Sequence, residues 1–104
     1  MKPLAYGYMR VSSDVDDHVV RELEQRIRRF AQERGFCFAV IFYEFTPGSY
    51  EAFDELTSEL QRADAHHVIV PSFSHLALNS ILRESMRDRL EHDAGAKVLE
   101  LSEC

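Results

Sequence analysis

The sequence predicts a single α/β domain: three layers, with a mainly parallel four-stranded sheet flanked by helices. Four apolar runs typical of buried strands alternate with three stretches in which apolar residues recur every three or four positions. Strands that alternate with helices in this way favour parallel pairing. The chain has 104 residues, of which 45% are hydrophobic, so it can bury one core. We therefore expect residues 1–104 to form one domain.

The first half of the chain predicts strand, helix and strand. Residues 4–11 form an apolar run typical of a strand in the middle of a sheet. Ser13 and the aspartates after it offer capping oxygens and negative charge for a helix start, and Gly35 suits its left-handed end. The strand expected over 36–45 is rich in aromatic residues, and its centre and Cys37 are expected to be buried. The inward residues expected on the helix are Val19, Leu23, Ile27, Phe30 and Ala31.

The second half predicts two further helix and strand pairs. A turn over 46–49 leads into a helix over 51–63, and a strand follows over 67–70. The next helix begins between His75 and Ser80, and 97–101 forms the last strand. The inward residues expected on the two helices are Phe53, Leu56 and Leu60, then Leu78, Leu82, Met86 and Leu90.

Charge and composition limit the partners. The formal net charge is -6, so tight DNA binding would need a local basic patch or a partner protein. No apolar run is long enough to span a bilayer, and we expect a cytoplasmic protein that does not bind membranes. Cys37 and Cys104 have no metal or disulfide spacing, and the adjacent His66 and His67 point to opposite faces of a strand. We therefore expect no metal and no cofactor. The helix over 51–63 has an acidic outer face, which suits a basic protein partner: Glu51, Asp54, Glu55 and Glu59.

Chemically capable side chains follow the predicted strands. Arg10 and Ser12 end the first strand, while Ser49, Ser72 and Ser74 follow two others. The carboxyl ends of parallel strands meet at one edge of a sheet, where sites form. A serine there could attack a phosphodiester if arginines neutralise the phosphate, because a guanidinium donates two parallel hydrogen bonds. The alternative for Ser12 is an ordinary helix-capping hydroxyl.

The segment Tyr6-Gly7-Tyr8-Met9-Arg10-Val11-Ser12-Ser13 resembles the start of the serine recombinases, the resolvase and invertase family. Their catalytic domain opens with a glycine, an aromatic residue, then Arg-Val-Ser followed by Ser or Thr. The resemblance implies a resolvase-like sheet in flavodoxin-like strand order. It also implies that Ser12 is the nucleophile and Arg10 the first of several active-site arginines.

The second signature of the family is altered in this chain. It resembles Leu-Asp-Arg-Leu-x-Arg, and aligned on Leu76 it places Ser74 at the aspartate, with His75 and Leu78 at the two arginines. The turn Gly48-Ser49 matches the family, but no arginine occurs between Arg34 and Arg62. Family members continue with a long helix and usually a separate DNA-binding domain, which we do not expect here.

These features support two functional hypotheses and leave a third open. In the first, the chain is a degenerate, truncated recombinase domain without strand exchange that acts as a regulatory or protein-interaction module. It would bind a protein partner or itself, and would bind DNA weakly or through a partner. In the second, it is an active recombinase subunit that uses Ser12 on DNA phosphodiesters, with cations supplied by Arg10, His75 or a partner chain. In the third, Ser12, Ser49 and Ser72 bind a small phosphorylated ligand.

Overall fold

The fold is described from a computed structural model, which covers residues 2–11, 15–46, 49–72, 75 and 80–101. The predicted helix over 51–63 and strand over 67–70 are confirmed with the same bounds, and the other predicted strands are one residue too long at one or both ends. The third helix starts at the late limit of its predicted interval. The elements in chain order are β1 (Leu4–Arg10), α1 (Asp17–Glu33), β2 (Cys37–Glu44), α2 (Glu51–Ala63), β3 (His67–Val70), α3 (Ser80–Asp93) and β4 (Lys97–Glu100).

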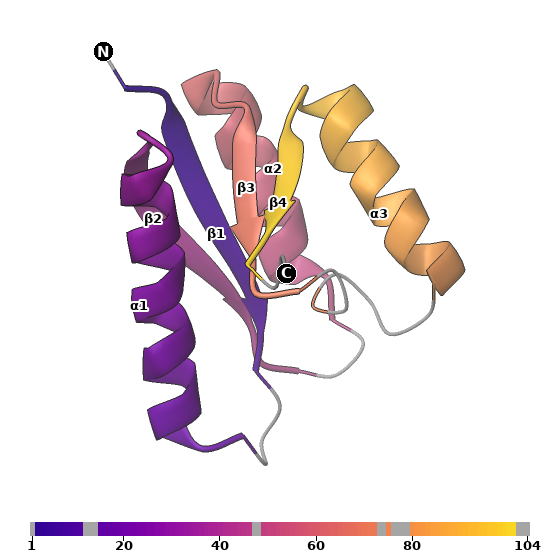
Figure 1. The fold of residues 1–104 in the computed structure, drawn as a ribbon. Coiled ribbons are helices and arrows are strands. Elements are labelled where there is room, and N and C mark those ends of the chain that lie inside the picture. Colours follow the sequence, from indigo (N-terminus) through magenta and orange to yellow (C-terminus); the bar gives the residue numbers. More distant parts are fainter. Residues whose placement is uncertain (1, 12–14, 47–48, 73–74, 76–79, 102–104) are drawn as a thin grey trace.

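The four strands form one parallel sheet in the order β2-β1-β3-β4. This confirms the predicted parallel sheet, its flavodoxin-like order and the position of β1 inside it. Because all four strands run the same way, their carboxyl ends lie at one edge, the lower edge in Figure 1. The loops that carry the predicted site residues leave the sheet at this edge.

Helices cover the two faces of the sheet unequally. Helix α1 packs on one face, where Ala5 and Met9 of β1 meet Ile27 of α1. Helices α2 and α3 pack on the other face, where Tyr6 and Tyr8 of β1 lie among buried residues of both helices. In Figure 1, β3 and β4 are therefore seen with no helix in front of them. The result is the predicted three-layer arrangement, in which two helices cover one face of the sheet and a single helix covers the other.

Gly7 allows α1 to approach the sheet closely. A Cβ atom added at Gly7 would lie 2.9 Å from Cγ1 of Ile41 and 3.5 Å from Cγ2 of Ile27. The first distance is too short for two carbon atoms, so any larger residue in the middle of β1 would push its neighbours apart. Gly35 has φ +79 and ends the region of α1 as predicted, because a left-handed residue suits glycine.

The prediction that Cys37 and the centre of the second strand are buried is wrong except at Ile41, which is 5% exposed. Cys37 is exposed, as is Ala39, and Val40 is 48% exposed. Strand β2 is at the edge of the sheet, and its pairing with β1 shifts by one residue between Phe38 and Ile41. This bulge and the missing outer neighbour leave side chains uncovered that would be enclosed in a central strand.

The predicted burial of two helix residues, Val19 and Leu82, is also wrong. Val19 is 44% exposed and Leu82 is 40% exposed. Both lie in the first turn of their helices, where the apolar stripe extends beyond the part of the helix that the sheet covers. The remaining expectations hold, with Leu23 and Phe30 half-buried, while Leu78 and Cys104 lie outside the described residues. The predicted inward residues that are buried are Ile27, Ala31, Phe53, Leu56, Leu60, Met86 and Leu90.

Candidate active site at the carboxyl ends of the strands

Strand β1 places Arg10 at the carboxyl edge of the sheet. Tyr6, Tyr8 and Arg10 alternate along the strand with the residues that face α1, so they share the face covered by α2 and α3. Arg10 pairs with Glu44 of β2, and the N–H of Val11 donates to the carbonyl of Glu44 at 2.8 Å. Pairing with β2 thus continues to the last described residue before Ser12.

The segment before α2 holds the guanidinium of Arg10. Its Nη1 donates to the carbonyl oxygen of Ser49 at 3.0 Å, and the guanidinium carbon lies 4.7 Å from the centre of the Tyr50 ring. A cation over an aromatic face at this distance is attracted to it. These contacts connect the end of β1 with the residues just before α2. They also fix the direction of the Arg10 guanidinium, although Arg10 is only half-buried.

Glu44 is a buried carboxylate behind Arg10. It is 4% exposed, and its Oε1 accepts the backbone N–H of Phe53 at 3.0 Å and the hydroxyl of Tyr8 at 3.3 Å. The N-cap residue of α2, Tyr50, makes no side-chain cap, so Glu44 supplies an acceptor and negative charge to that helix end. Burial is the main cause that raises the pKa of Tyr8, and the charge of Glu44 adds to it while Arg10 opposes it. Tyr8 therefore remains a protonated donor.

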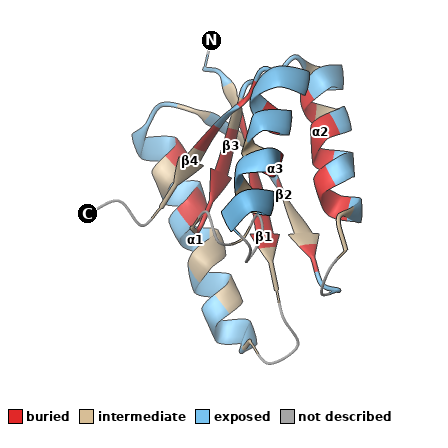
Figure 2. Cartoon of the chain, turned by 90° about the vertical axis from the view of Figure 1, so that its right-hand side faces the viewer, coloured by how far each residue is buried: buried red, intermediate tan, exposed pale blue. Residues whose placement is uncertain are grey.

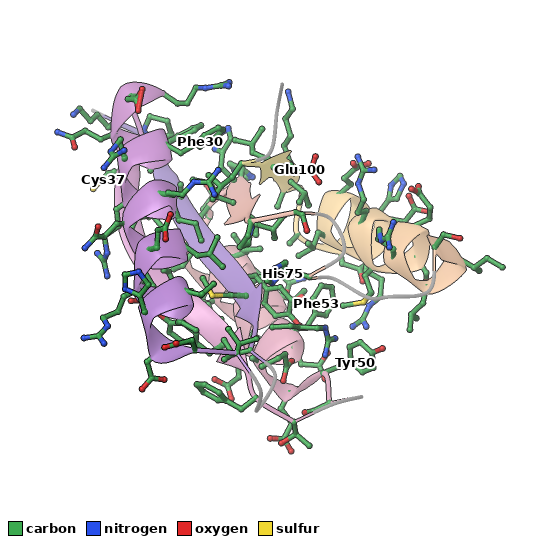
Figure 3. All side chains as sticks on the ribbon, turned by 60° about the horizontal axis from the view of Figure 1, so that its bottom comes forward. Phe30, Cys37, Tyr50, Phe53, His75 and Glu100 are labelled. Atoms are coloured by element: carbon green, nitrogen blue, oxygen red, sulfur yellow. The ribbon has the colours of Figure 1, made fainter. Side chains whose placement is uncertain are left out.

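His75 contacts β1 as a hydrogen-bond acceptor. Its Nδ1 accepts the backbone N–H of Arg10 at 3.1 Å, and its own backbone N–H donates to the carbonyl of Ser72 at 3.0 Å. Burial, and secondly the nearby charge of Arg10, lower the pKa of His75. An accepting Nδ1 cannot carry a proton, so the ring is neutral with its hydrogen on Nε2. Figure 3 brings the carboxyl edge of the sheet forward and labels His75, Phe53 and Tyr50 there.

The structure brings together four of the six residues that the sequence singled out. Arg10, Ser49, Ser72 and His75 meet at the carboxyl edge, although Ser49 and Ser72 make their contacts through backbone carbonyls. The Oγ of Ser49 instead accepts the N–H of Glu51 at 3.4 Å, at the start of α2. Ser12 and Ser74 lie outside the described residues.

Sequence reasoning missed Tyr8, Glu44 and Tyr50. Two of them carried a usable signal. Tyr8 is two positions before Arg10 and so shares its side of the strand, and Glu44 is a charged residue at the end of an apolar strand. The sequence carried no signal for Tyr50. Its ring contacts Arg10, which is 40 positions away in the chain, and no sequence spacing predicts such a contact.

The described part of the chain gives no sign of a metal site or a membrane helix. No three His, Cys, Asp or Glu side chains among the described residues come together in a way that could hold a metal ion. No helix in the same ranges is both long enough and apolar enough to cross a membrane.

The structure therefore defines a class of protein: a parallel α/β domain whose inner strand β1 presents a positioned arginine at its carboxyl end. Comparison with known families makes this specific, since the family described as "Resolvase, N terminal domain" matches residues 5–103. The chain therefore belongs to the resolvase family of serine recombinases, as its first strand indicated.

Comparison with solved structures agrees on the fold. The chain is similar to the structure described as "Crystal structure of the C-terminal catalytic domain of ISC1926 TnpA, an IS607-like serine recombinase". The TM-score is 0.79 at 15% sequence identity, and the match covers 97% of this chain and 71% of that one. At this identity the likeness establishes the fold and not the activity. No curated protein matches the sequence.

Proposed function

We propose that this domain keeps the recombinase fold but lacks strand exchange and acts as a regulatory or protein-interaction module. The observation that carries the proposal is the contact of His75. In the family pattern this position holds an arginine, whereas His75 here is neutral and its Nδ1 accepts the N–H of Arg10 at 3.1 Å. It cannot supply positive charge to a phosphate without giving up that hydrogen bond.

Loss of cations is expected to be costly for this chemistry. Removing one well-placed transition-state donor lowers the rate by about 10²–10³-fold, and several losses combine. The family pattern predicts two further losses, at Leu78 and in the stretch without arginine between Arg34 and Arg62. Arg10 alone would have to neutralise a phosphate that family members bind with several arginines.

Covalent trapping on supercoiled DNA tests this proposal. The wild type, Ser12→Ala, and a triple variant that restores the family pattern (Ser74→Asp, His75→Arg, Leu78→Arg) are incubated with DNA, and intact mass is scanned for a DNA-linked serine. We expect no adduct from the wild type. An adduct from the triple variant that disappears when Ser12→Ala is added would show which groups the wild type lacks. A Ser12-dependent adduct from the wild type would refute the proposal.

One observation favours an active enzyme as the second candidate. The guanidinium of Arg10 is directed by the Ser49 carbonyl and the Tyr50 ring, and preorganised cations of this kind are used in phosphoryl transfer. In this case Ser12 would attack the phosphodiester, with the missing cations supplied by a partner chain. The same trapping experiment decides between the two, since a Ser12-dependent adduct is expected only here.

The proposal also includes the partners of this domain. We expect self-association or binding of a protein partner, and DNA contact that is weak or depends on a partner, because the net charge is -6. Exposed apolar side chains at the start of α3, Ile81 at 81% and Leu82 at 40%, favour self-association. Light scattering over a range of concentrations tests it, and a monomer throughout would contradict it. The cytoplasmic location stays a prediction.

A further inference from the structure

A hollow lies between helix α2 and the edge strand β2, outside the strand-end site. Its volume is about 430 Å³, and Phe42 of β2 contributes an aromatic ring to it. That ring packs on Tyr6 with a centroid distance of 6.1 Å, so it is held in place from behind. The residues that line the hollow are Phe42, Asp54, Glu55, Ser58, Glu59 and Arg62.

The wall of the hollow is acidic. It has three carboxylates against the single guanidinium of Arg62. Glu59 is already engaged, because it accepts the Tyr6 hydroxyl at 2.9 Å and the Arg62 Nε at 2.8 Å. Asp54 lies 3.4 Å from Arg89, which reaches it from α3. Glu55 is exposed and contacts no other charged group among the described residues, so its charge is available to a partner.

The adjoining edge of the sheet offers main-chain hydrogen bonds. Strand β2 is the outermost strand, and its eight residues pair only with β1 within the described part of the chain. Val40 on this edge is 48% exposed. An uncovered edge can accept a further strand, and side chains of that strand then reach the pockets beside it.

We propose that the β2 edge and this hollow bind an extended basic segment of a partner protein. The segment pairs with the backbone of β2, rests an apolar side chain on Phe42 and directs a lysine or arginine to Glu55. Long-range attraction supports the choice of a basic segment, because the chain carries a net charge of -6. The same carboxylates repel nucleic acid.

A second copy of this chain fits the edge less well. Two β2 edges paired about a twofold axis would keep the same face of each sheet on the same side, which brings the two α2 helices together. Each helix has an acidic outer face, so like charges would meet across the interface. The inference goes beyond the proposed function, because a basic segment could bind here whether or not Ser12 is active.

The test uses a fluorescein-labelled nine-residue peptide of alternating lysine and valine, with a glutamate and valine peptide as its control. We expect the lysine peptide to bind and to shift the backbone NMR signals of β2 and of the first turns of α2. Glu55→Lys should weaken binding by about tenfold or more, because it removes the attracting charge and adds a repelling one. Glu84→Lys makes the same charge change on the exposed outer side of α3 and should leave affinity within about twofold.

A further variant tests the edge itself. Val40→Lys places a positive charge on an exposed position of the strand and should reduce binding of the lysine peptide while leaving the fold intact. Equal losses from Glu55→Lys and Glu84→Lys would overturn the proposal, because they would mean unspecific attraction. Equal binding of the glutamate peptide, or dimerisation with NMR shifts on β2, would overturn it as well. None of these outcomes depends on whether the domain cleaves DNA.

Discussion

The two faces of the sheet differ in how completely they are covered. On the face under α2 and α3, 14 apolar residues of the described chain are buried and 4 are half-buried. On the face under α1, only 6 are buried and 9 are half-buried. Figure 2 shows the same contrast, with red along the inner side of α2 and mostly tan or pale blue on α1. One helix cannot cover a four-stranded sheet, so most of the burial that stabilises the fold lies on the α2 and α3 side.

The largest expected effect compares matched leucines on the two faces. Leu56 on α2 is fully buried, whereas Leu23 on α1 is half-buried. Leu56→Ala should lower the free energy of unfolding by about 3–4 kcal/mol, because it removes buried methylenes and leaves a cavity. Leu23→Ala should lower it by about 1 kcal/mol. Urea unfolding measures both, and equal losses would mean that α1 contributes as much burial as the other two helices.

The second prediction concerns a close contact on the face of the sheet that α1 covers. Gly7→Ala puts a methyl group 2.9 Å from Cγ1 of Ile41 and should cost about 1–3 kcal/mol of unfolding free energy. In an Ile41→Ala background the added methyl has room, so the extra cost of Gly7→Ala should nearly vanish. A full cost in that background would show that the strain comes from the β1 backbone instead.

The third prediction concerns Glu44, the buried carboxylate on the face of the sheet that α2 and α3 cover. Glu44→Gln keeps the shape but removes the charge that accepts hydrogen bonds from Tyr8 and from the start of α2. We expect a loss of about 1–2 kcal/mol in thermal or urea unfolding. Glu84→Gln is the control, because Glu84 is exposed and lies 3.6 Å from Arg87, and such surface pairs contribute less than about 1 kcal/mol. Equal effects would mean that Glu44 does not stabilise α2.

The fold could be predicted from the sequence because its evidence is local. The alternation of apolar runs and helical stripes gave the element order, and Leu56, Leu60 and Ile27 are buried as their spacing indicated. The burial of Cys37 and Val40 was predicted wrongly because an apolar strand has the same sequence pattern at the edge of a sheet as in its centre. Strand order is decided by contacts far apart in the chain, and no spacing reports it.

The site was predicted only where its residues follow one strand. Arg10 was found because it ends an apolar run in a recognisable motif. The role of His75 was not, because its bond to Arg10 joins residues 65 positions apart. From the sequence, His75 was expected to be only a weak substitute for a lost arginine, because the usual pKa of histidine, about 6.5, leaves the ring mostly neutral. The geometry adds a reason that the sequence did not contain, since the hydrogen bond from the Arg10 N–H requires a neutral ring.

The smallest expected effect is a pH dependence that originates at His75. Its pKa in the folded state lies below the usual value of about 6.5, so the unfolded chain binds the proton more readily. Stability should therefore be full above about pH 6.5 and should fall as the pH drops below it. The charged group that faces the ring is Arg10, which resists protonation further. His67 has a lowered pKa for the same main cause, burial, and adds to the same trend.

The contribution of His75 can be isolated with His75→Asn, whose side-chain oxygen can accept the Arg10 N–H without titrating. This variant should lose stability less steeply than the wild type between pH 7 and pH 5, as measured by urea unfolding at each pH. His18→Gln, at the exposed start of α1, controls for the loss of an imidazole away from the site. If the two variants show the same slope, the bond between His75 and Arg10 does not hold the end of β1. The neutral state of His75 would then no longer separate this domain from family members that carry an arginine at that position.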